Sequence, residues 1–143
     1  MKVSDVMTSD IQICSPEDDV RKAANCMLEA DTGSIPVCNG KKIVGMITDR
    51  DIAVRGVAKG MGPDTKLSEL MTKDVEFARE ADDTATIAKR MSDSQVRRLP
   101  VIDSNDEIVG MVSLGDLSRG TENDDANFAL EGVSRKGSQH QQG

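Results

Sequence analysis

The residues best suited to chemistry in this chain are a hydroxyl and a carboxylate three positions apart, and the pattern occurs twice. The two occurrences are Gly45-x-x-Thr48-x-x-Asp51 and Gly110-x-x-Ser113-x-x-Asp116. At the start of a helix, the hydroxyl can hold a phosphate and the carboxylate can accept hydrogen bonds from both ribose hydroxyls of a nucleotide. The same spacing also fits a helix capping box. Capping and nucleotide binding therefore compete for one carboxylate.

Arginines lie beside both motifs, but they come from different places in the repeat. Arg50 lies inside the first motif, where the second has Gly115, and Arg98 stands where the first repeat has Ser34. A guanidinium can hold phosphate through its planar fork of donors. We therefore expect two related but unequal sites. The alternative is that both arginines are solvated residues that pair with the abundant Asp and Glu.

A short apolar-Pro-Val segment precedes each motif. These segments are Ile35-Pro36-Val37 and Leu99-Pro100-Val101. An adenine base needs apolar contacts and backbone hydrogen bonds rather than charge. We expect Ile35, Pro36, Leu99 and Pro100 to wall the base.

Composition argues against several other classes of function. The only histidine is His140, and no Cys-x-x-Cys pair occurs, so we expect neither a metal site nor histidine-based catalysis. A net charge of −7 with two Phe and no Tyr or Trp argues against nucleic-acid binding. No apolar run approaches the roughly 20 residues that span a bilayer. We expect a cytoplasmic protein that is not an enzyme.

The patterning predicts two similar units that share a core. Strands are expected at residues 11–13, 35–38 and 42–48, with a helix that begins near Ser15-Pro16 and a second that runs from Thr48 to about Val57. Asn39-Gly40 is a hairpin signal. In the second repeat, strands are expected at 99–103 and 107–113. The predicted boundaries are 1–60 and 61–120, followed by a polar, partly disordered tail at 121–143 with a helical turn near 127–133.

The order of these motifs resembles a known family. Met7-Thr8 and Met71-Thr72, the two Pro-Val segments and the two Gly-x-x-Thr/Ser-x-x-Asp motifs repeat at an offset of 64 or 65 residues. The chain is similar to tandem cystathionine-β-synthase (CBS) domains, a Bateman module, and especially to stand-alone bacterial proteins with one such pair. The resemblance implies an α+β fold of two β-α-β-β-α repeats, packed with pseudo-twofold symmetry.

The resemblance also implies a function. Clefts between the repeats of such proteins take adenosine nucleotides, so AMP, ADP, ATP, NAD or S-adenosylmethionine is expected as a ligand, with no required cofactor. We expect a non-enzymatic sensor, a homodimer, and a regulated partner protein in trans. The alternatives are a structural module with empty clefts and a redox sensor. In the implied fold Cys14 and Cys38 come near one another, which allows a disulfide between them.

Overall fold

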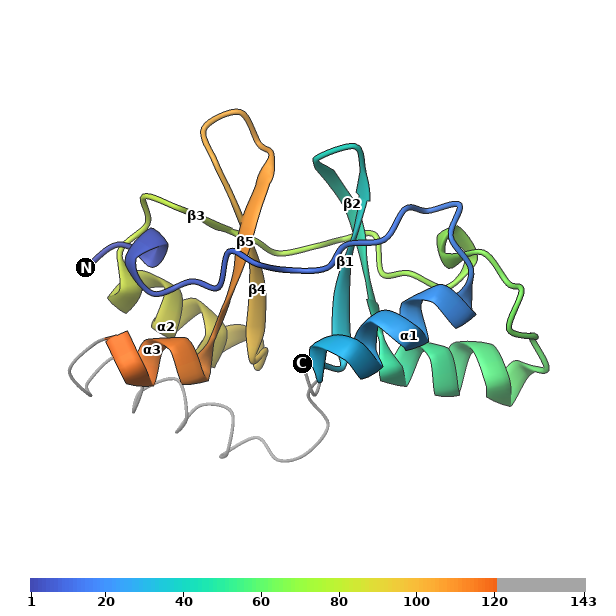
Figure 1. Ribbon diagram of the computed structural model, residues 1–143. Coiled ribbons are helices and arrows are strands. Elements are labelled where there is room, and N and C mark those ends of the chain that lie inside the picture. Colours follow the sequence, from blue (N-terminus) through green and yellow to red (C-terminus); the bar gives the residue numbers. More distant parts are fainter. Residues whose placement is uncertain (121–143) are drawn as a thin grey trace. The chain divides into compact units, whose positions relative to one another are not determined.

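A computed structural model describes residues 1–120 and divides the chain into two units, each of which is considered by itself (Figure 1). The first unit is Ile11–Val75. The second unit joins Met1–Asp10 to the described residues 76–120. The predicted tail and the helical turn near 127–133 lie outside the described residues. Within residues 1–120, no helix is long and apolar enough to cross a membrane.

The first unit is built on a β-hairpin flanked by helices. Helix α1 (Val20–Ala30) leads to the antiparallel strands β1 (Ser34–Asn39) and β2 (Lys42–Thr48). A π-helix, η2 (Asp51–Gly56), follows β2, and two 3-10 turns, η3 (Val57–Lys59) and η4 (Leu67–Glu69), complete the unit. Gly40 adopts φ +65° in the hairpin turn, which a glycine does without strain. The predicted hairpin is confirmed.

The second unit repeats this plan with one additional short strand. It begins with the 3-10 turn η1 (Val3–Asp5), and β3 (Ala78–Arg79) runs parallel to β4 (Arg98–Ile102). Helix α2 (Thr84–Ser94) connects these strands. Strand β5 (Ile108–Ser113) is antiparallel to β4 and leads into α3 (Leu114–Gly120). The mixed helix and strand content is the predicted α+β fold.

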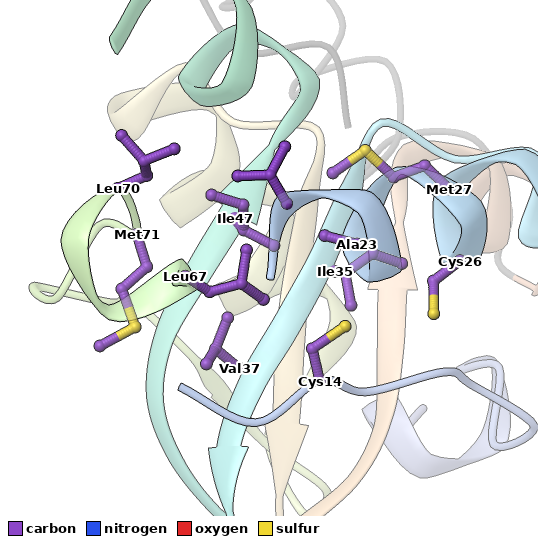
Figure 2. Packing of buried hydrophobic residues seen from close by; sticks show 11 residues of the cluster. Cys14, Ala23, Cys26, Met27, Ile35, Val37, Ile47, Leu67, Leu70 and Met71 are labelled. Atoms are coloured by element: carbon purple, nitrogen blue, oxygen red, sulfur yellow. The ribbon is translucent and has the colours of Figure 1, made fainter. Parts of the chain in front are cut away.

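Each unit has its own hydrophobic core. In the first unit, Ile35 and Val37 of β1 and Ile47 of β2 point toward α1 and the η4 turn (Figure 2). In the second unit, the corresponding side chains of β4 and β5 pack against α2 and η1. Buried members of the second core are Val3, Ala78, Ile87, Ala88, Met91, Leu99, Val101, Val112, Leu114 and Leu117. Alternation along each strand places every second side chain in the core.

The first helix begins later than the sequence predicted. Ser15 and Asp18 do form a turn, because the Ser15 N–H donates to Asp18 Oδ2 at 2.7 Å, but α1 starts at Val20. Asp19 caps the helix by accepting from the Lys22 N–H at 2.9 Å. Asp83, which lies 64 residues later, caps α2 in the same way. The pairs Asp18-Asp19 and Asp82-Asp83, which recur at the repeat offset, are the sequence signal for these two helix starts.

The predicted strand at residues 11–13 does not form. Only Cys14 bridges to β1, where its N–H donates to the Pro36 carbonyl and its own carbonyl accepts from the Cys38 N–H. The turn at Ser15 follows at once, so no ladder can extend. In the second unit the equivalent segment is β3, which is also short.

The segments that begin the two sequence repeats are exchanged between the units. The Thr8 N–H donates to the Met111 carbonyl at 2.8 Å, and the Met111 N–H donates back at 2.9 Å. Thr72 and Met46 make the same pair of bonds at 2.8 and 2.9 Å. The start of the first sequence repeat therefore completes the second unit, and the start of the second repeat completes the first.

Candidate functional site

Thr48 and Asp51 form a reciprocal pair at the junction of β2 and the helical segment that follows it. Thr48 Oγ1 accepts from the Asp51 N–H at 3.0 Å, and Asp51 Oδ2 accepts from the Thr48 N–H at 3.0 Å. Both residues are buried, and Asp51 is only 7% exposed. The other carboxylate oxygen of Asp51 lies 3.7 Å from Arg55 Nη1. We call this arrangement the Thr48 box.

The second unit contains the same arrangement where β5 enters α3. Ser113 Oγ accepts from the Asp116 N–H at 3.1 Å, and Asp116 Oδ2 accepts from the Ser113 N–H at 2.9 Å. Asp116 is 5% exposed. This is the Ser113 box. Both motifs thus have the capping geometry that the sequence offered as the alternative to binding, and each carboxylate uses one oxygen for it.

The glycines of the two motifs make room for the protein's own backbone. A Cβ on Gly110 would lie 2.6 Å from the Thr8 carbonyl oxygen, and a Cβ on Gly45 would lie 2.9 Å from that of Thr72. The structure assigns these glycines to the close approach of the exchanged Met-Thr segments, which pass directly over them.

A buried hydroxyl faces the Thr48 box across the hairpin. Ser34 pairs with Thr48 in the β1–β2 register and is 7% exposed. Its Oγ has no hydrogen-bond partner within residues 1–120. Ser34 corresponds to Arg98 at the repeat offset, and its residue type alone does not mark it as a site residue. The hairpin register would have revealed it, since a strand that ends at Thr48 must begin opposite Ser34.

The predicted cations lie at the boxes, on different elements. Arg50 is exposed at the start of η2, and Arg98 is half-buried on β4, where it pairs in register with Ser113. Neither guanidinium has an ion-pair partner in the part of the chain that the structure describes. The two arginines therefore come from different elements, the start of a helical segment in the first unit and a strand in the second.

The predicted base-walling residues separate into two groups. Ile35 and Leu99 point into the two cores. Pro36 and Pro100 are the next residues along each strand and lie on the opposite face of the hairpin. Pro36 therefore shares a face with Ser34 and Thr48. A ligand at that face would contact Pro36 or Pro100 rather than Ile35 or Leu99.

The cysteines are buried free thiols. Cys14 is in register with Val37, so its side chain and that of Cys38 leave opposite faces of the strand pair. The sulfur near Cys14 belongs instead to Cys26, and Figure 2 shows both thiols directed into the same part of the core. Burial, assisted by Cys26, raises the pKa of Cys14 to about 12, and burial raises the pKa of Cys38 to about 11. Such thiols are poor nucleophiles at neutral pH.

Comparison with known proteins identifies the repeat. The family model described as "CBS domain" matches residues 3–56 and 67–121. The CBS domain-containing protein YhcV of Bacillus subtilis is 36% identical over 135 residues, which are 94% of this chain and 96% of that protein. Hypoxic response protein 1 of Mycobacterium tuberculosis is 34% identical over 119 residues, which are 80% of this chain and 81% of that protein.

Solved structures with the same fold include two with bound groups. Hypoxic Response Protein I with two coordinated zinc ions superposes with a TM-score of 0.77 at 30% identity, over 85% of this chain and 99% of that chain. Within residues 1–120, this chain has no group of three or more His, Cys, Asp or Glu that could hold a metal ion. The second is the CBS domain pair of protein MJ0100 in complex with 5'-methylthioadenosine and S-adenosyl-L-methionine. It superposes with a TM-score of 0.73 at 27% identity, over 83% of this chain and 94% of that chain.

Proposed function

Because the chain belongs to the CBS domain family, we propose that each unit binds an adenosine-containing nucleotide at its box and that the protein is a non-catalytic regulatory sensor. In the first unit, Thr48, Asp51 and Arg50 would contact the ligand. In the second unit, Ser113 and Asp116 would do so, with Arg98 as the cation.

The buried, unpartnered hydroxyl of Ser34 carries this proposal. Leaving a buried donor or acceptor unsatisfied costs about 1–3 kcal/mol. Capping alone gives no reason to place such a group opposite Thr48, since the box is already closed by its own two hydrogen bonds. A ligand at the box would supply the missing partner.

The geometry suggests a role for each group. Asp51 uses Oδ2 for the cap, which leaves Oδ1, now facing Arg55, to accept from ribose hydroxyls. Arg50 and Arg98 would each hold a phosphate through charge-assisted hydrogen bonds. Adenosine ligands in the CBS pair of protein MJ0100 support the choice of base.

The proposed mechanism is a population shift. A nucleotide that binds one arrangement of the chain better than another favours that arrangement. A partner protein would read the change in trans, and we expect the sensor to act as a homodimer in the cytoplasm. The second candidate function is a structural module, which the closed capping boxes favour. A redox sensor is disfavoured because the raised thiol pKa values keep Cys14 and Cys38 protonated.

A thermal-shift screen with AMP, ADP, ATP, NAD and S-adenosylmethionine tests the proposal. At a hundredfold excess over Kd, binding to the native state adds about 2.7 kcal/mol of stability. No shift with any of these ligands would favour the structural module.

Ser34→Ala then separates binding from capping. Because Ser34 Oγ has no partner within residues 1–120, this variant should fold at least as stably as the wild type. It should lose one ligand hydrogen bond, or about 2–12-fold in affinity. Ser104→Ala, in the exposed second hairpin turn, is the control. Equal affinity of Ser34→Ala and wild type for the responding nucleotide would refute the role of Ser34.

A further inference from the structure

An open depression adjoins the Thr48 box within the first unit. Its volume is about 490 Å³, which falls in the usual range of ligand sites. The lining residues come from η2 and from the segment around η4: Arg55, Ser68, Glu69, Met71, Thr72, Lys73 and Asp74. Arg55 lines the depression and also contacts the Thr48 box, because its Nη1 lies 3.7 Å from Asp51 Oδ1. The box and the depression are therefore continuous through one side chain.

The charges in this depression are of both signs. Arg55 and Lys73 are cationic, whereas Glu69 and Asp74 are anionic, and all four residues are exposed. Bare phosphate would be attracted by the first pair and repelled by the second. A phosphate chain that carries Mg²⁺ suits such a mixture, since Mg²⁺ is usually held by one or two carboxylates together with phosphate oxygens.

The two repeats differ in this lining at only the two cations. At the repeat offset, the other five lining residues correspond to the same or a similar residue in the second repeat: Ser4, Asp5, Met7, Thr8 and Asp10. Lys73 corresponds to Ser9, and Arg55 corresponds to Gly120. The fold alone would keep both repeats alike here, so the difference points to a ligand that only the first unit handles.

We propose that this depression binds the phosphate chain of a nucleoside di- or triphosphate with its Mg²⁺, with Arg55 and Lys73 as the phosphate-binding side chains. The inference rests on the proposed nucleotide site at the Thr48 box. It assigns a polyphosphate nucleotide to the first unit, and it leaves the second unit to ligands with fewer phosphates.

Calorimetric titration of the full chain with ATP and with AMP, both in Mg²⁺, tests this assignment. Lys73→Gln should weaken ATP binding about two- to fivefold, as expected for one exposed charged contact. AMP binding should stay within about twofold in the same variant. Arg55→Gln is the second variant, and Lys41→Gln, in the exposed hairpin turn of the same unit, is the charge-matched control.

The outcomes separate the two proposals. An unchanged ratio of ATP to AMP affinity in both Lys73→Gln and Arg55→Gln would overturn the phosphate subsite and leave the nucleotide site standing. Absence of ATP binding in the wild type would overturn the phosphate subsite, and absence of any response to the five ligands of the thermal-shift screen would overturn both proposals. Stronger ATP binding in EDTA than in Mg²⁺ would overturn the assignment of the metal complex. An equal loss in Lys41→Gln would show a general charge effect and would also count against the subsite.

Discussion

Replacing Gly110 with alanine should destabilise the second unit more than any other single-methyl change at the repeated motifs. The new Cβ would lie 2.6 Å from the Thr8 carbonyl oxygen and 3.0 Å from Met7 Sδ, whereas ordinary contact begins at 3.4 Å. The Met7 side chain can move aside. The Thr8 carbonyl cannot, because it accepts from the Met111 N–H at 2.9 Å while the Thr8 N–H donates to Met111 O at 2.8 Å.

The magnitude follows from those two hydrogen bonds. Overpacking in a tight site costs about 1–3 kcal/mol, and each strained backbone hydrogen bond is worth about 0.5–1.5 kcal/mol. Lower entropy of the unfolded chain returns about 0.4–1 kcal/mol. The expected loss for Gly110→Ala is therefore about 1–6 kcal/mol. Gly45→Ala should cost less, because its closest contact is the Met71 sulfur at 2.7 Å and the Thr72 carbonyl is at 2.9 Å.

Urea unfolding followed by circular dichroism measures this loss, and Gly62→Ala is the matched control. A Cβ on Gly62 meets nothing within 4 Å, and its φ lies outside the left-handed region. Gly62→Ala should stay within about 0.5 kcal/mol of the wild type. If Gly110→Ala is as stable as Gly62→Ala, the Met-Thr segment does not lie over Gly110 in solution and the exchange of segments is refuted.

Three further predictions concern stability. Ile47→Ala should lower the free energy of unfolding in urea by about 2–5 kcal/mol, because Ile47 is fully buried in the first core. Leu28→Ala, at an exposed position, should cost under about 0.5 kcal/mol, and similar losses in the two variants would contradict the assigned core. Asp19→Ala should lower stability by about 1 kcal/mol through loss of the α1 cap, and Asp19→Asn should restore most of it; no loss in the alanine variant would reject the cap. The pKa of Cys14 rises from an ordinary value of 9.0 to about 12 on folding, so the native state holds this proton more tightly than the unfolded chain does. The free energy of unfolding should therefore fall as pH rises from about 9 to 12, by at most roughly 1.4 kcal/mol per pH unit. Cys14→Ala should flatten that slope under reducing conditions, and an unchanged slope would exclude Cys14 as its source.

Local sequence signals predicted the two hairpins well. The bounds of β2 match the predicted strand, and β4 and β5 lie within one residue of theirs at each end. Alternation and turn residues act over a few positions, so the sequence shows them directly. Helix starts were less certain, since Ser15-Pro16 and Asp18-Asp19 offered two starts in succession. The aspartate pair determines the cap in both repeats, and the first signal marks only a turn.

The exchange of Met-Thr segments could not be predicted from local pattern. The contacts between Thr8 and Met111, and between Met46 and Thr72, join residues far apart in the sequence. Nothing in the periodicity of either segment specifies its partner. The same limit applies to the space above Gly45 and Gly110. A glycine signals a close approach, but its neighbours in sequence do not reveal what approaches it.

The repeated motif therefore combines residues kept for different physical reasons. The glycines admit the exchanged backbone, and the hydroxyl–carboxylate pairs close the boxes; both features recur in the two units because both units need them to fold. Under the proposed function, any difference in ligand preference between the two units must then come from positions where the repeats differ. These positions are Ser34 against Arg98, Arg50 against Gly115, Arg55 against Gly120, and Lys73 against Ser9. Substitutions at the shared positions should lower stability and affinity together, whereas exchanging the exposed differing residues, Arg50 with Gly115 and Lys73 with Ser9, should alter ligand preference while stability is retained.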